Sequence, residues 1–134
     1  ISGLLTRERD KLRAELKSAP KNINLIQTLA YVDIFTNDFD ESYKLYNEVI
    51  DEFKINDAGT LFLASVAATG ANKITNAIAL LELTKLNDPS AVENRAALGF
   101  MYQQIDNIKA ALIQYSKVGN VGYNNEFYDF MIDN

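Results

Sequence analysis

The side chains that could do chemistry in this sequence are mostly carboxylates, because the 134 residues include no histidine and no cysteine. Histidine titrates near neutral pH without help from its surroundings, and cysteine supplies thiolate nucleophiles, zinc ligands and disulfides. Their absence removes the commonest general base, imidazole and thiolate metal sites, and covalent cross-links. Composition therefore favours an interaction domain over an enzyme.

The candidates for chemistry are two pairs of carboxylates and one acidic run. The pairs, Asp38 with Asp40 and Asp51 with Glu52, are close in sequence and could act as acid and base. Neighbouring helical positions point in different directions, however, and no nucleophile or oxyanion motif accompanies these pairs. The acidic run 37–41 has no central glycine and no bidentate glutamate in the frame of a calcium loop. We predict no catalytic residue, no metal and no cofactor; a carboxylate-based hydrolase within a ring of helices is the enzymatic alternative.

Composition and charge restrict the partners. The chain is 48% hydrophobic and 23% charged, which is typical of one folded soluble domain, and no apolar stretch is long enough to cross a membrane. Residues 1–20 hold five Lys/Arg and three Asp/Glu, whereas residues 21–134 hold eight against fifteen. Without a clustered basic stripe we expect no nucleic acid, and the mixed charges of 7–11 indicate an exposed helix surface. Cytoplasmic and periplasmic locations are both compatible with this composition.

Apolar periodicity and chain breakers predict an all-α protein. No segment alternates with a period of two for long enough to form a strand, and the connections are short, so neighbouring helices should be antiparallel. Ser90 to Glu93 has the pattern of a capping box, Asp38 and Asp106 are expected N-caps, and Gly70 is expected to end a helix. The predicted helices cover 4–18, 23–36, 39–54, 58–69, 73–87, 91–104, 107–118 and 124–132.

Small residues recur at a nearly constant spacing. Steps of 35 and then 34 residues separate three small residues, Ala30, Ser65 and Gly99. Twelve residues after each comes a second small residue, followed four residues later by a tyrosine or leucine: Ser42 and Tyr46, Ala77 and Leu81, Ala111 and Tyr115. Small residues at these positions would let the two helices of a hairpin cross closely, with the larger residue covering the crossing.

These residues resemble the tetratricopeptide repeat (TPR), a helix–turn–helix unit of 34 residues. The third unit matches best, and the first departs by placing Asp33 where an aromatic is expected, which predicts a local change of register or a partly exposed position. The resemblance implies an α-α superhelix of antiparallel hairpins; another helical array or bundle is the alternative. The expected organisation is a single domain over 1–134, with an incomplete repeat helix 4–18, repeats near 23–57, 58–91 and 92–123, and a C-terminal helix 124–132.

The resemblance also implies a concave groove lined by the first helix of each pair. Position by position, the groove residues are Asn24, Gln27, Tyr31, Phe35, Phe62, Val66, Phe100, Gln103 and Gln104, with Thr69, Glu93 and Ala96 on the same face. The alternative for the aromatic residues is burial between helices. Family members that clamp a terminal carboxylate use Lys, Arg and Asn in this groove, but Gln27, Phe62 and Ala96 are among the residues at the matching positions here, so we expect no such clamp.

We therefore expect a non-catalytic protein–protein interaction scaffold, part of a larger bacterial protein or assembly, that binds a peptide or helix in this groove. Because the repeat body is acidic, the ligand should be neutral, basic or apolar. The alternative is a structural module that self-associates by stacking its terminal helices into a homo-oligomer.

Overall fold

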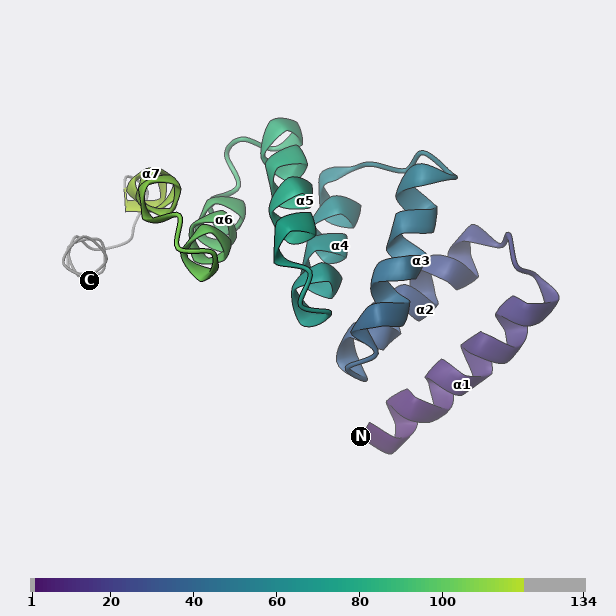
Figure 1. The fold of residues 1–134 in the computed structure, drawn as a ribbon. Helices are drawn as coiled ribbons and strands as arrows, with labels where there is room; N and C mark the ends of the chain where they lie inside the picture. Colours follow the sequence, from purple (N-terminus) through teal and green to yellow (C-terminus); the bar gives the residue numbers. More distant parts are fainter. Residues whose placement is uncertain (1, 120–134) are drawn as a thin grey trace.

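The computed structural model describes residues 2–119, and all regular secondary structure in this part of the chain is helical. The helices form an extended row of antiparallel neighbours, with α1 and α7 at opposite ends (Figure 1). Their bounds are α1 Ser2–Ser18, α2 Ile23–Phe35, α3 Phe39–Asp51, α4 Ala58–Gly70, α5 Ile74–Asn87, α6 Val92–Gln104 and α7 Ile108–Gly119. Three hairpins, α2–α3, α4–α5 and α6–α7, follow α1, and the all-α prediction is confirmed.

Most predicted helix ends are correct to within one residue, and two differ by more. Helix α1 begins at Ser2, two residues before the predicted start. Helix α3 ends at Asp51 rather than 54, because the backbone turns away from the helix and Lys54 adopts a φ of 58°. The predicted helix 124–132 lies outside the described residues.

The same turn joins the two helices of every hairpin. Its key residue has a positive φ of 60–62° and is Asn37, Asn72 or Asp106, at steps of 35 and 34 residues. In the first turn the next amide, that of Asp38, donates to the carbonyl of Asp33 at 2.8 Å, and the other two turns repeat this bond. This pattern is a Schellman motif, which favours Asn or Asp over other non-glycine residues at the left-handed position.

The repeated turn corrects one of the two predicted N-caps. Asp106 is the left-handed turn residue, and the side chain that caps α7 is Asn107, whose Oδ1 accepts from the amide of Ala110 at 3.2 Å. Asp38 occupies the N-cap position of α3 without a side-chain capping bond, because its carboxylate accepts from Thr36 and Arg9 instead.

The predicted capping box at α6 is also wrong. Its N-cap residue is Ala91, and the Ser90 hydroxyl donates to Oδ1 of Asp88 at 3.0 Å rather than accepting from the helix. Side-chain caps do occur at α2, where Asn22 accepts from the amide of Leu25, and at α4, where Asp57 accepts from that of Thr60. Gly70 ends α4 as predicted.

The small residues lie at the helix crossings, as their spacing predicts. Ala30 and Ser42 are both fully buried, and the Ser42 hydroxyl donates to the carbonyl of Ala30 across the hairpin at 2.6 Å. At the third crossing, a Cβ added to Gly99 would come within 2.7 Å of the ring of Tyr115. These approaches exclude larger side chains, so the crossings fix the geometry of each hairpin.

Asp33 keeps the repeat register but is fully buried, so the expectation of a register change or a partly exposed position is wrong. Its carbonyl accepts the turn bond that Ala68 and Tyr102 accept in the next two repeats. The backbone therefore follows the repeat, and only the side chain departs from it.

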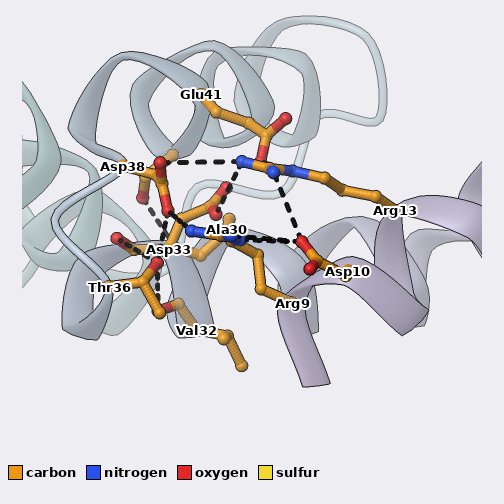
Figure 2. A network of polar contacts seen from close by, with 10 residues as sticks. Arg9, Asp10, Arg13, Ala30, Val32, Asp33, Thr36, Asp38 and Glu41 are labelled. Atoms are coloured by element: carbon orange, nitrogen blue, oxygen red, sulfur yellow. Dashed lines mark hydrogen bonds and ion pairs between the residues drawn. The ribbon is translucent and has the colours of Figure 1, made fainter. Parts of the chain in front are cut away.

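Charged side chains join α1 to the first hairpin (Figure 2). Arg9 Nη1 donates to Oδ2 of Asp38 at 2.7 Å, and Arg13 Nε donates to Oε1 of Glu41 at 2.8 Å. Leu12, which lies between these two arginines in the sequence, is buried. The predicted exposed surface over 7–11 is therefore wrong for Arg9, whose side chain is only 18% exposed.

Candidate functional site

Three neighbouring hollows lie on the face formed by the first helices of the hairpins, α2, α4 and α6, which we call the first-helix face. The first hollow has a volume of about 310 Å³ and is lined by Gln27, Thr28, Tyr31, Tyr46, Thr60 and Leu63. The central hollow, of about 430 Å³, is lined by Tyr31, Ala58, Gly59, Phe62, Leu63, Thr84, Asp88, Ala91, Glu93 and Asn94. The third hollow, of about 330 Å³, is lined by Phe62, Ser65, Val66, Thr69, Leu81, Ala97, Phe100 and Met101.

Shared aromatic side chains connect the three hollows. Tyr31 lines the first and central hollows, and Phe62 lines the central and third hollows. Phe100 borders the third hollow from α6. The hollows therefore form one strip that crosses three successive repeats.

The aromatic residues on α2 and α6 keep a large part of their surface open to solvent. Tyr31 is 47% exposed and Phe100 is 50% exposed, while Phe62 is partly buried. Phe35 is also exposed and packs edge-on against Tyr31, with ring centroids 5.1 Å apart. The alternative of burial between helices is therefore wrong for Tyr31, Phe35 and Phe100.

The predicted groove residues divide into two sets. Five of the nine line the hollows: Gln27, Tyr31, Phe62, Val66 and Phe100. Thr69 and Glu93, which were expected on the same face, line them as well. Four do not line these hollows: Asn24, Phe35, Gln103 and Gln104. Gln103 is engaged elsewhere, because its Oε1 accepts from the hydroxyl of Tyr115 on α7 at 3.3 Å. Ala96 also lies outside the linings of the hollows.

Sequence reasoning missed three polar residues of the central hollow, Thr84, Asp88 and Asn94. Asn94 is only 3% exposed and lies on the same side of α6 as the buried Leu98 and Met101. Asn94, Leu98 and Met101 have the i, i+4, i+7 spacing of one helix face, and this spacing could have identified Asn94 as an inward-facing polar residue. Asp88 follows the end of α5, and its approach to α6 depends on the loop between the two helices.

Charge is distributed unevenly over the hollows. Asp88 and Glu93 are the charged residues in the linings, and no lysine or arginine is among the described residues that line the three hollows. Between residues 2 and 119, no ion pair includes either carboxylate. The strip is therefore apolar and aromatic, with uncompensated negative charge at its centre.

Metal binding and membrane insertion would need other features of the chain. Among the described residues, no group of three or more acidic side chains is arranged to hold a metal ion. None of the helices α1 to α7 combines the length and the hydropathy needed to cross a lipid bilayer.

Comparison with known proteins shows the fold. No family model and no curated protein matches the chain. Among solved structures, MamA 41-end from Desulfovibrio magneticus RS-1 has a TM-score of 0.79 and 20% identity, over 89% of this chain and 67% of that one. MamA AMB-1 has a TM-score of 0.82 and 20% identity, over 90% and 70% of the two chains. The match to another MamA RS-1 structure covers 66% of that chain. This chain therefore spans about two thirds of the length of the structures it matches. MamA is a TPR-like helical repeat protein, and the prediction of a TPR-type solenoid is confirmed.

Proposed function

We propose that this chain is a non-catalytic protein-interaction scaffold that binds a peptide or a helix along the first-helix face. The observation that carries the proposal is the row of Tyr31, Phe62 and Phe100, which come from three consecutive first helices and border connected hollows. Large, half-exposed aromatic rings on a rigid support are typical of the residues that dominate binding energy in protein interfaces. The TPR-type fold supports the same function, since this face is the concave one in the family.

The proposal includes the organisation predicted from the sequence. We assign about three TPR units over residues 23–123, within a single domain over 1–134 that belongs to a larger bacterial protein or assembly. The MamA structure from Desulfovibrio magneticus is a bacterial example of the fold. The two carboxylates and the absence of cations among the described lining residues favour a neutral, basic or apolar ligand.

Selection from a random peptide library, followed by titration of the enriched peptides, tests this function. Replacing Tyr31 and Phe100 together with serine should weaken binding by at least about tenfold, because both rings supply contact area at the strip. The matched control replaces Leu83 and Leu86 with serine, since both are exposed on α5 and neither lines a hollow. Enrichment of no peptide, or equal binding by the wild type and the Tyr31/Phe100 variant, would contradict the proposal.

A second candidate is self-association through the terminal helices. Ile105, Ile108 and Ile113 are exposed at the α6–α7 end of the row, and Leu4 is exposed on α1 at the other end. Stacking of one end on another chain would bury such residues. Sedimentation equilibrium over a concentration series tests this candidate: a mass that rises with concentration supports it, and a monomer at the highest concentration excludes it.

A further inference from the structure

The central hollow contains the one strongly buried amide among the described linings of the strip. The side chain of Asn94 borders this hollow and is 3% exposed. No described residue forms a hydrogen bond with it, whereas the buried hydroxyl of Thr84 in the same hollow donates to the carbonyl of Leu80 at 2.8 Å. Its amide atoms are not among the fully buried polar atoms without a partner, so they remain accessible from the hollow. A ligand that enters the hollow with hydrogen-bond donors would supply the missing partner for its oxygen.

Two carboxylates border the same space. Asp88 and Glu93 come from the α5–α6 loop and the first turn of α6, and neither is in an ion pair with a described residue. Some carboxylates of the fold have cationic partners, such as Asp38 with Arg9 and Glu41 with Arg13, whereas others are exposed and unpaired, such as Asp40. What distinguishes Asp88 and Glu93 is that both border one hollow, where a cationic side chain of a ligand could pair with them.

Aromatic groups complete the lining. Tyr31 and Phe62 border the central hollow from α2 and α4. A cation near the face of an aromatic ring is attracted by the electrons of the ring, and this attraction increases when water is excluded. Gly59, on the same wall, has no side chain to fill the space, and a Cβ added there would meet only the Asp57 carboxylate at 3.3 Å.

We propose that the central hollow binds the side chain of an arginine in the peptide ligand. The guanidinium would be held by Asp88, Glu93 and the amide oxygen of Asn94, with its planar face and methylene groups against Tyr31 and Phe62. This inference rests on the proposed function and specifies the chemistry of its ligand. Arginine fits better than lysine because its planar group offers five donors in fixed directions and stacks on aromatic rings.

The enriched peptides provide the test. They should share an arginine, and its replacement by the neutral isostere citrulline should weaken binding to the wild-type chain by about tenfold or more, as loss of charge-assisted hydrogen bonds does. In the double variant Asp88→Asn/Glu93→Gln, arginine and citrulline peptides should bind within about twofold of one another. The control variant Asp40→Asn/Asp51→Asn removes the same charge from exposed positions on α3 and should retain the preference.

The possible failures are distinct. If no peptide is enriched, the proposed function fails, and the arginine site fails with it. If peptides are enriched and need Tyr31 and Phe100, but share no arginine or bind equally well with citrulline, the groove stands and the arginine site is wrong.

A second variant separates a ligand-binding role of Asn94 from a structural one. Asn94→Ala should reduce the preference for arginine over citrulline, because it removes the amide oxygen from the hollow, and a ratio of two affinities is insensitive to a general loss of stability. An unchanged preference would overturn the role of Asn94 in the site.

Discussion

Arg13 on α1 lies beside the buried carboxylate of Asp33 on α2, with 4.0 Å between Nη2 of the arginine and Oδ1 of the aspartate (Figure 2). Asp33 is fully buried, and neither of its carboxylate oxygens has a hydrogen-bond partner among the described residues. Arg13 directs its short contact to Glu41 instead, at 2.8 Å. The guanidinium therefore compensates the Asp33 charge only in part.

This relationship predicts an unusual pH dependence. Burial, followed by the nearby Glu41 carboxylate, raises the pKa of Asp33 from 3.8 to about 8, while Arg13 lowers it by a smaller amount. Between these two values the folded state retains a proton that the unfolded state releases, so the contribution of Asp33 to stability falls as pH rises through this window. The groups that face Asp33 are Arg9 and Arg13 from α1, Asp38 from the turn and Glu41 from α3 (Figure 2).

The variant Asp33→Asn tests this dependence, because its side chain does not titrate. Its free energy of unfolding relative to the wild type should rise from about pH 5 to about pH 8, by at most about 1.4 kcal/mol per pH unit. Urea unfolding at both pH values measures the difference, and the exposed Asp40→Asn is the control. A difference between Asp33→Asn and the wild type that is the same at both pH values would show that Asp33 is ionised throughout.

Asp38 should behave in the opposite way. Hydrogen bonds from Thr36 and then from Arg9 lower the pKa of its carboxyl below 3.8. Its contribution is therefore present above the unfolded pKa and is lost as pH falls through the lower folded value. We expect Asp38→Asn to destabilise the chain by about 1 kcal/mol near neutral pH, with the difference shrinking as pH falls below about 4. Denaturant unfolding at neutral and acidic pH measures this, with Asp51→Asn as the exposed control; an effect that grows on acidification would be inconsistent with the ion pair.

The crossing between α6 and α7 should not tolerate a larger residue. Ala111 is fully buried where Gly99 meets Tyr115. Ala111→Leu should lower the free energy of unfolding by about 1–3 kcal/mol through overpacking. The control is Ala79→Leu on the exposed side of α5, and thermal unfolding compares the two. An unchanged melting temperature for Ala111→Leu would mean that the helices do not cross closely at this residue.

The repeat pattern predicted the hairpins well because it depends on local spacing. Ala30 and Ser42 are twelve residues apart, and a tight turn between two antiparallel helices brings residues at this separation into contact. The roles of Asn and Asp were harder to predict, because the same side chains favour N-caps and left-handed turns. Asp106 was expected to be a cap and is the turn residue.

Contacts between distant residues explain most of what the sequence did not predict. Arg9 lies 29 residues before its partner Asp38, and one sequence offers no pattern that pairs them. The candidate site was predicted in part for the same reason. Tyr31 and Phe100 follow from the repeat offsets, and Phe62 lies one turn earlier on the equivalent helix, whereas the position of Asp88 depends on how the loop after α5 packs.

The central claim is that the ligand lies on the first-helix face, and NMR of the isotopically labelled chain tests it most directly. Addition of an enriched peptide should shift backbone amides on α2, α4 and α6, with the largest changes around Tyr31, Phe62 and Phe100. The amides on the outer faces of α3 and α5, including those of Asp40, Leu83 and Leu86, should change little. Shifts concentrated on α3 and α5, with α2, α4 and α6 unperturbed, would contradict the account.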